Sequence, residues 1–361
     1  MRPWEEYIRR VEPYVPGEQP QDPYVIKLNT NENPYPPAPG VTRALEKLEG
    51  EKLRKYPDPS AAGLVSAIAR RYGVNMDQVF VGVGSDDVLA MCFLTFFGGE
   101  KPILFPDITY SFYDVWASLF RIPYERRPLN DEFEIVPEDY QGENGGVIFP
   151  NPNAPTGKLL PLEAVEEIVR ANRDVIVIVD EAYIDFGGVS ALPLIDQYDN
   201  LLVVQTFSKS RSLAGMRIGF ALGNPRLIRY LNDVKYSFNS YTMNQAAIAA
   251  GVAALEDQKY FERTRRQIMV TRERTRESLQ KLGFSGPDSS ANFLFVTHRD
   301  CPAEELFEAL KQAGIYVRYF KKPRIDNYLR ITIGTNDEME RLIEFLEQYL
   351  KNRGGNADGN V

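Results

Sequence analysis

The chain has 361 residues, 43% of them apolar, which is enough for two domains or for one large α/β domain with an appendage. Its 42 Lys and Arg against 50 Asp and Glu give a net charge of −8, which argues against nucleic-acid binding. The N-terminus carries charges where a signal peptide has its apolar core, and no run of about 18 apolar residues occurs. We therefore predict a cytoplasmic protein without membrane association.

The cysteines and the histidine restrict the chemistry further. Cys92 and Cys301 lack metal-ligand spacing and are expected to be buried thiols. The single histidine, His298, lies in a polar stretch and is expected at the surface. Metal centres and catalytic triads built on several histidines are excluded, so we predict no metal site.

The first elements in chain order are an arm and two helices. Residues 1–40 are rich in proline and polar residues and are predicted to form an N-terminal arm that lies on other parts of the protein. A helix is expected over 41–48. A second helix is expected to begin at Ser60, as its N-cap, and to stop at Gly73.

Apolar strands and amphipathic helices then alternate. Strands are predicted over 79–84, 101–106, 145–152, 174–183, 201–209 and 217–223, and helices over 86–98, 109–120 and 162–172. Continuous apolar strands separated by helices favour an α/β fold with a mainly parallel sheet covered on both faces.

A second, smaller α/β unit is predicted towards the C-terminus. Helices are expected over 244–257, 261–283, 302–314 and 337–351, and strands over 292–297, 315–320 and 328–334. We expect a large domain over 41–255, a small domain over 256–352 and a disordered tail over 353–361.

Polar side chains follow the predicted strands where each strand ends, and ligands of open parallel sheets bind at that edge. Ser85 and Asp86 open a helix after a Gly, which forms an anion cradle of backbone N–H groups. The hydroxyls of Thr206 and Ser208 can bind the same anion, and Arg217 can neutralise it. A phosphate monoester fits this set.

Four further residues could bind the remaining groups of a cofactor. Asp180 ends an apolar strand and needs a cationic partner, such as a protonated ring nitrogen. Tyr183 can bond a ring hydroxyl, and Tyr110 offers a flat face for stacking. Lys209, desolvated and close to Arg217, is expected to be an amine nucleophile of lowered pKa. Together these groups indicate pyridoxal 5′-phosphate.

Each feature alone has an ordinary structural explanation. A Gly-Ser-Asp turn is usually a helix start, a lysine after a strand is usually solvated, and Tyr110 alone is more often a core residue. The conjunction of these features, each at a strand end, favours the cofactor site.

The sequence resembles the fold-type I pyridoxal-phosphate aminotransferases and, within them, the histidinol-phosphate aminotransferase family. The segments that carry the resemblance span nearly the whole chain: KLNTNENPY (27–35), KYPDP (55–59), GSDD (84–87), TYSFY (109–113), NPNAPTG (151–157), DEAYIDF (180–186), TFSKSRSLAGMRIG (206–219), ANFLF (291–295), VR (317–318) and LRITIG (329–334).

The resemblance implies a large domain with a mainly parallel seven-stranded sheet between helices, a smaller α/β C-terminal domain and an N-terminal arm. It implies Lys209 as the Schiff-base lysine and proton shuttle, and Asp180 and Tyr183 as partners of the ring nitrogen and ring oxygen. Tyr56 resembles a tyrosine that reaches the cofactor phosphate of a neighbouring subunit, which implies a homodimer with shared sites. Arg330 matches the arginine for a substrate carboxylate, and Arg318 and Tyr14 match groups that bind the substrate's phosphate.

Two positions depart from the family's pattern. Ala154 stands where the family commonly has Asn beside the ring oxygen, and Asn153 is the candidate to substitute for it. Asp87 stands where Glu is more usual and is expected to cap the helix.

The implied activity is transfer of an amino group between L-histidinol phosphate and 2-oxoglutarate, in histidine biosynthesis. Two other enzymes on the same scaffold stay open at this point: an aromatic amino acid aminotransferase and a threonine-phosphate decarboxylase. A regulator that keeps the fold only for binding would need an appended DNA-binding domain, for which the chain has no spare residues.

Overall fold

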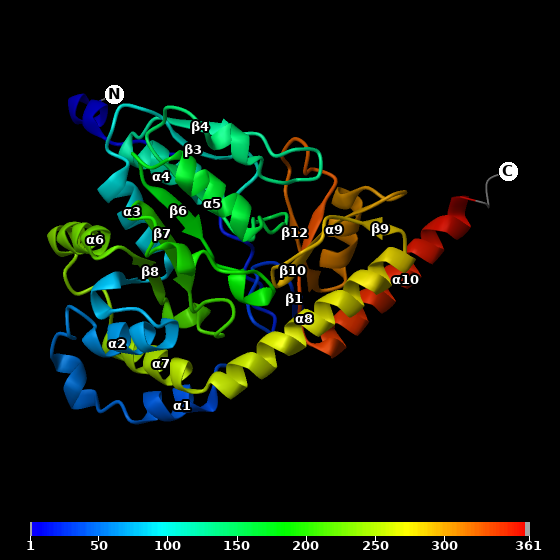
Figure 1. Cartoon of the computed structure of the whole chain (residues 1–361). Helices are drawn as coiled ribbons and strands as arrows, with labels where there is room; N and C mark the ends of the chain where they lie inside the picture. Colours follow the sequence, from blue (N-terminus) through cyan, green and yellow to red (C-terminus); the bar gives the residue numbers. More distant parts are fainter. Residues whose placement is uncertain (1, 358–361) are drawn as a thin grey trace.

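The computed structural model describes residues 2–357 (Figure 1). The helices are α1 (Pro39–Glu46), α2 (Ala62–Tyr72), α3 (Ser85–Phe96), α4 (Phe112–Phe120), α5 (Leu162–Ala171), α6 (Pro225–Phe238), α7 (Gln245–Glu256), α8 (Gln258–Lys281), α9 (Ala303–Gln312) and α10 (Asn336–Ala357). The strands are β1 (Ile26–Lys27), β2 (Val79–Gly82), β3 (Ile103–Pro106), β4 (Tyr124–Arg127), β5 (Val147–Pro150), β6 (Val177–Asp180), β7 (Leu201–Thr206), β8 (Gly219–Gly223), β9 (Phe284–Ser285), β10 (Phe293–His298), β11 (Ile315–Tyr316), β12 (Arg318–Tyr319) and β13 (Leu329–Thr332).

The central sheet has seven strands in the order β2-β8-β7-β6-β5-β3-β4. The pairs β3–β4, β3–β5, β5–β6 and β6–β7 are parallel. Strand β8 runs antiparallel to both β2 and β7, because only a short segment separates β7 from β8. The predicted α/β class and the mainly parallel sheet are confirmed.

Helices cover both faces of this sheet, as the apolar strands require (Figure 1). Alternate strand side chains enter two cores. Val179 and Val203 pack with apolar residues of α1, α2, α5 and α7. Ile178 and Leu202 pack with those of α3, α4 and α6. The sheet is thereby held rigidly, and the residues at its carboxyl edge share that rigidity.

A four-stranded antiparallel sheet, in the order β12-β13-β10-β9, forms the C-terminal layer beside α8, α9 and α10. Its core includes Leu294, Ile331, Leu306 and Leu342. The arm joins this layer, because β1 pairs in parallel with β11. The arm therefore crosses from the C-terminal sheet to the edge of the central sheet. The domain boundaries at residues 40 and 255 stay a prediction.

Several local predictions were wrong. Strand β4 and helix α6 were missed, β4 because it is a half-exposed edge strand of charged residues. Helix α2 begins at Ala62, whose N–H donates to Asp58 Oδ2 at 2.8 Å, so Ser60 is not the cap. His298 is buried, with Nε2 2.9 Å from the Leu282 carbonyl oxygen. Residues 353–357 continue α10, and 358–361 lie outside the described residues.

Other local predictions were right. Gly73 ends α2 in the left-handed conformation, and both cysteines are buried and free. Asp87 accepts a hydrogen bond from the Val83 N–H at 2.8 Å, at the start of α3, as a helix-capping residue does.

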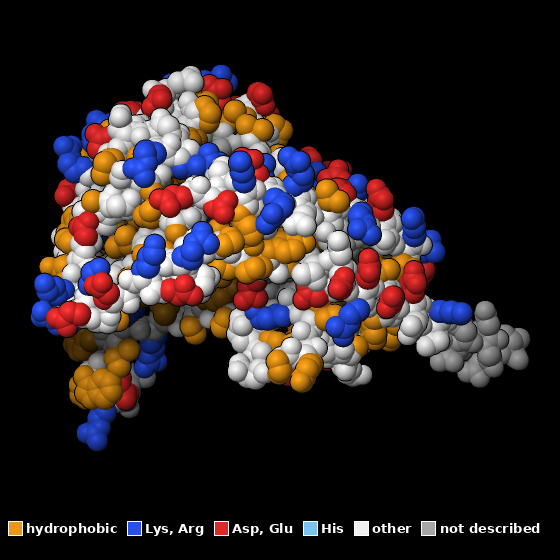
Figure 2. Space-filling model, turned by 90° about the horizontal axis from the view of Figure 1, so that it is seen from below, with side chains coloured by type: hydrophobic (Ala, Val, Ile, Leu, Met, Phe, Trp, Pro, Cys, Tyr) orange, Lys and Arg blue, Asp and Glu red, His pale blue; other side chains and the backbone are white. Residues whose placement is uncertain are grey.

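The surface carries both signs of charge. In the view of Figure 2, Lys and Arg side chains alternate with Asp and Glu, and apolar side chains show between them. Within residues 2–357, no helix is long and apolar enough to cross a membrane.

Candidate active site

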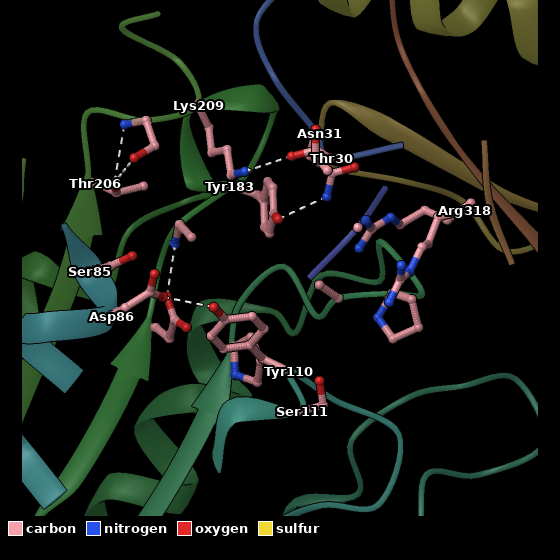
Figure 3. Close-up of a pocket in the computed structure, with 18 of the residues that line it drawn as sticks. Thr30, Asn31, Ser85, Asp86, Tyr110, Ser111, Tyr183, Thr206, Lys209 and Arg318 are labelled. Carbon is pink, nitrogen blue, oxygen red and sulfur yellow. Dashed lines mark hydrogen bonds between the residues drawn. The ribbon is translucent and has the colours of Figure 1, made fainter. Parts of the chain in front are cut away.

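A cavity of about 240 Å³ lies beyond the carboxyl ends of β6 and β7, where the arm and the C-terminal sheet meet the central sheet (Figure 3). Parallel strands deliver their following residues to this edge, so segments far apart in sequence converge there. Twelve residues predicted from the sequence line the cavity: Tyr14, Ser85, Asp86, Tyr110, Asp180, Tyr183, Thr206, Ser208, Lys209, Arg217, Arg318 and Arg330.

Two predicted residues do not line this cavity. Asn153 is buried behind its wall, where its amide donates to the Ile108 carbonyl oxygen at 2.9 Å and to Thr156 Oγ1 at 3.1 Å. Its neighbour Ala154 lines the wall instead. Tyr56 is 80% exposed on the outer surface and stacks on Tyr241, with ring centroids 4.6 Å apart.

The predicted anion cradle is formed at the start of α3. The first N–H groups of a helix have no partner inside it, and those of α3 face the cavity end where Ser208 and Arg217 lie. Gly84, at φ +85°, allows this packing, because a Cβ there would lie 2.4 Å from Arg217 Nη2. Thr206 Oγ1 donates to Ser208 Oγ at 3.0 Å, which fixes the two hydroxyls side by side.

Asp86 ties the cradle to the stacking residue. Its Oδ1 accepts the Tyr110 hydroxyl at 2.7 Å, and its Oδ2 lies 3.2 Å from Arg217 Nη2. Arg217 is thus held at the cradle by one carboxylate, by the Ala214 carbonyl oxygen at 3.2 Å and by a weaker contact of 3.4 Å to Ser208. A dianionic ligand at this place would form a charge-assisted hydrogen bond with the same guanidinium group.

Lys209 follows β7 and turns its amine into the cavity. Its Nζ donates to the backbone carbonyl oxygen of Thr30 at 3.0 Å and lies 5.9 Å from the centroid of the Tyr183 ring (Figure 3). Desolvation, assisted by the nearby Arg330 cation, lowers the pKa of Lys209 from 10.5 to about 8. A substantial fraction of the amine is therefore neutral and nucleophilic near physiological pH.

Asp180 ends β6 and is 4% exposed. It accepts the Tyr113 hydroxyl at 3.0 Å and the Ala182 N–H at 3.2 Å. Burial raises the pKa of Asp180 to about 6, against the lowering effect of the Tyr113 hydrogen bond. No Lys or Arg of the described residues pairs with it, so the carboxylate faces the cavity without a counter-charge.

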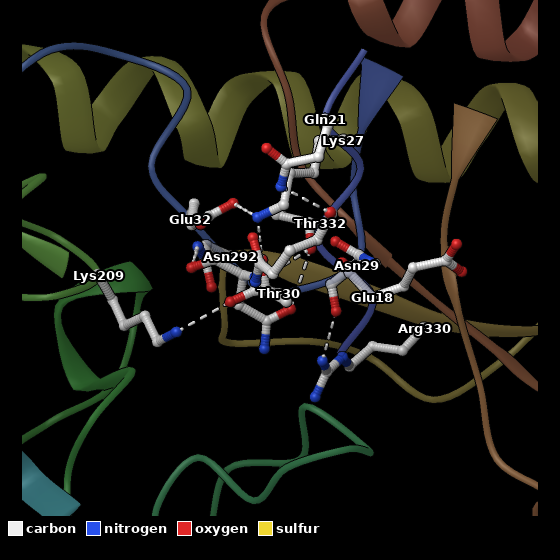
Figure 4. A network of polar contacts seen from close by, with 12 residues as sticks. Glu18, Gln21, Lys27, Asn29, Thr30, Glu32, Lys209, Asn292, Arg330 and Thr332 are labelled. Carbon is white, nitrogen blue, oxygen red and sulfur yellow. Dashed lines mark hydrogen bonds and ion pairs between the residues drawn. The ribbon is translucent and has the colours of Figure 1, made fainter. Parts of the chain in front are cut away.

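The sequence reasoning missed the arm residues as site residues. Thr30 receives Lys209, and Asn31 Nδ2 donates to the Tyr183 hydroxyl at 2.9 Å. The Asn29 carbonyl oxygen accepts Arg330 Nη2 at 3.0 Å. Figure 4 shows this segment beside Lys209 and Arg330. The sequence signal for these residues was the polar string NTNEN (29–33), which directly follows an apolar residue. This string lies at least 176 positions from Lys209, so the sequence alone does not link the two.

Two arginines and a tyrosine stand at the other end of the cavity. Arg330 Nε is buried and has no hydrogen-bond partner within the described chain. Arg318 Nη2 lies 3.5 Å from the Val15 carbonyl oxygen, and Tyr14 stacks on Phe112 with centroids 4.2 Å apart. This end of the cavity is therefore cationic and suits anionic groups of a substrate.

The residues present fit pyridoxal 5′-phosphate. The cradle supplies N–H groups, hydroxyls and a guanidinium for a phosphate, and the buried Asp180 lacks the cation that a protonated ring nitrogen supplies. Tyr183 and Lys209 lie between these two ends.

The chain belongs to the family of class I and II aminotransferases, because the model of that family, "Aminotransferase class I and II", matches residues 23–346. It is therefore an enzyme of the transaminase class. It is 54% identical to a histidinol-phosphate aminotransferase 1 of Hydrogenovibrio crunogenus over 96% of this chain and 98% of that protein. It is 52% identical to a histidinol-phosphate aminotransferase of Clostridium beijerinckii over 97% and 98% of the two chains.

Its fold is similar to a crystal structure of histidinol-phosphate aminotransferase from Sinorhizobium meliloti in complex with pyridoxal-5′-phosphate. The TM-score is 0.83 at 25% identity, and the match covers 91% of each chain.

The environment of Lys209 predicts that its amine loses its proton at a lower pH than an ordinary lysine in the cofactor-free protein. The rate of Lys209 acylation, followed by peptide mass spectrometry against pH, should reach half its plateau near pH 8, because burial and Arg330 disfavour the ammonium form. Arg330→Gln should move this midpoint upward. A midpoint that stays near 10.5 in the parent protein would contradict the account.

Proposed function

We propose that this chain transfers an amino group between L-histidinol phosphate and 2-oxoglutarate, a step of histidine biosynthesis, with pyridoxal 5′-phosphate carried on Lys209. One observation carries the proposal most strongly. A partly neutral lysine amine and a buried carboxylate without a counter-charge share one cavity with an anion cradle. The high identity to histidinol-phosphate aminotransferases over nearly the whole chain supports the substrate.

The cofactor, when bound, supplies an aldehyde that takes up the amino group and a ring that accepts electrons. The chain's own residues do the rest. Asp180 would hold a proton on the ring nitrogen, because its buried carboxylate would gain a cation there. Tyr183 would hydrogen-bond the ring oxygen, and Tyr110 would stack on the ring. The phosphate would be held by Ser85, Asp86 through its backbone, Thr206, Ser208 and Arg217.

Lys209 acts as the base for the proton transfer. Its free amine would take a proton from the substrate carbon, and burial, assisted by Arg330, lowers the pKa of Lys209 towards the range in which the amine is neutral. The Thr30 carbonyl oxygen, 3.0 Å from Nζ, keeps the amine at the cavity floor when it is protonated.

The cationic end of the cavity suits two anionic substrates in turn. Histidinol phosphate carries a phosphate and no carboxylate, whereas 2-oxoglutarate carries two carboxylates. Arg330 would take a carboxylate of the acceptor, and Arg318 with Tyr14 would take the phosphate of the donor. All three line the one cavity.

We propose that the active form is a homodimer. Tyr56 lies on the outer surface of its own chain, away from its own cavity, and stacks on the exposed Tyr241. Apolar and aromatic side chains on a surface mark a site of association. In the dimer, Tyr56 would reach the cofactor phosphate of the partner's site. The proposed location is the cytoplasm, whose reducing conditions suit two free cysteines.

Arg318 provides the first test of the substrate assignment. Arg318→Gln should raise KM for histidinol phosphate about 10- to 100-fold, with a smaller change in kcat, because a charge-assisted contact to the phosphate is lost. Steady-state formation of glutamate from 2-oxoglutarate measures both constants. Lys321→Gln, which removes an exposed lysine paired with Glu304, is the matched control and should leave both unchanged.

An unaltered KM in Arg318→Gln would count against this role of the arginine. Preference of the parent protein for phenylalanine or tyrosine would assign an aromatic aminotransferase instead. Release of carbon dioxide from threonine phosphate without any oxo-acid would assign a decarboxylase.

Mixed dimers test the shared site. Lys209→Ala and Tyr56→Phe homodimers should be impaired, the second through cofactor binding weakened about 10-fold. A heterodimer of the two chains contains one site with an intact Lys209 from one chain and an intact Tyr56 from the other, and that site should bind the cofactor as the parent does. Measured affinities no better than those of Tyr56→Phe would show that Tyr56 does not serve the partner.

A further inference from the structure

Asn31 lies in the N-terminal arm, but it is buried and its backbone and side chain are both fixed by hydrogen bonds. It is 1% exposed, and its backbone adopts φ 56°, a left-handed conformation that costs a non-glycine residue energy. Its N–H donates to Thr332 Oγ1 at 3.0 Å, and its carbonyl oxygen accepts Asn292 Nδ2 at 3.0 Å. Its side chain is fixed at both ends, by Thr332 and by Tyr183.

The hydrogen bonds define which end of the Asn31 amide faces Tyr183. Thr332 Oγ1 already accepts the Asn31 N–H, so its own proton is available for Asn31 Oδ1, 3.0 Å away. The Nδ2 group then donates to the Tyr183 hydroxyl oxygen at 2.9 Å (Figure 4 shows the Thr332 side of this network, and Figure 3 the Tyr183 side). A phenol has one proton and accepts through its oxygen. Its proton is therefore directed away from Asn31.

The loop that contains Ala154 packs beside Tyr183 and offers no second side-chain amide to the cavity. Ala154 and Pro155 line the cavity there and carry no polar side-chain atom. The nearest side-chain amide of that loop, Asn153, is committed to the Ile108 carbonyl oxygen and to Thr156. Tyr183 is consequently the donor on which a ring oxygen in this part of the cavity depends.

We propose that Asn31 is a positioning residue that acts through Tyr183. By donating to the phenol oxygen, it turns the single phenol proton towards the ring oxygen of the cofactor and strengthens that hydrogen bond. This inference rests on the proposed function, because it concerns the cofactor that the function requires.

In the alternative role, Asn31 only anchors the arm through Thr332 and Asn292, and its hydrogen bond to the Tyr183 hydroxyl has no effect on the cofactor. The two roles differ in one spectroscopic quantity. A donor to the ring oxygen stabilises the negative charge left there when the lysine-linked cofactor loses its proton, so a weaker donor raises the pH midpoint of the cofactor's visible absorption band.

The test is a pH titration of that band in purified protein loaded with pyridoxal 5′-phosphate. Asn31→Gly keeps the left-handed backbone without strain and removes the amide. It should raise the midpoint by about 0.5 unit in the parent protein. In the Tyr183→Phe background, whose own midpoint is raised, Asn31→Gly should produce no further shift, because its intermediary is gone.

Asn31→Asp is a second variant, for the case that the glycine protein does not fold. Aspartate keeps the shape and tolerates the left-handed backbone, but it accepts the Tyr183 proton and removes the donor from the ring oxygen. Its midpoint should rise towards that of Tyr183→Phe.

Equal shifts from Asn31→Gly in both backgrounds, or an unshifted midpoint in both Asn31 variants, would overturn this inference and leave the proposed function standing. Absence of any pH-dependent visible band in the parent protein would overturn both.

Discussion

The site is governed by the burial of charged groups without matching counter-charges. Asp180 is buried with no cation, and its pKa is raised to about 6 by desolvation. Lys209 is desolvated beside Arg330, and its pKa falls to about 8. Both groups are shifted towards their neutral forms, at a cost to the stability of the empty protein. A ligand with a cationic group beside Asp180 would relieve part of this cost.

The same constraint explains the architecture around the cavity. The central strands place Asp180 and Lys209 at one rigid edge, and the arm closes that edge from the side of the C-terminal sheet (Figure 1). Three consecutive arm residues, Asn29, Thr30 and Asn31, each contact a different charged or phenolic group of the site. The arm is therefore part of the candidate active site, and Asn31 links it to the Tyr183 hydroxyl.

The sequence predicted the parts of this site whose signals are local. Asp180 ends the apolar strand β6, and Lys209 follows β7, so the ends of both strands could be recognised from the polar residues that come after the apolar ones. The arm contacts were not predicted, because they depend on the pairing of β1 with β11 and on bonds from Thr332, 301 positions from Asn31. Strand β4 was missed for a related reason: its residues are charged, and only its neighbour β3 holds it in the sheet. The burial of His298 likewise follows from a tertiary contact, with Phe284 stacked edge-on to its ring.

The central claim is that Lys209 and Asp180 serve amino transfer from histidinol phosphate. The most direct measurement is a single half-reaction: histidinol phosphate is added to the cofactor-loaded protein without any oxo-acid, and the visible absorption band of the cofactor is followed. We expect conversion to the spectrum of pyridoxamine phosphate, reversed by 2-oxoglutarate. A spectrum that does not change with histidinol phosphate, but does change with phenylalanine, would contradict it.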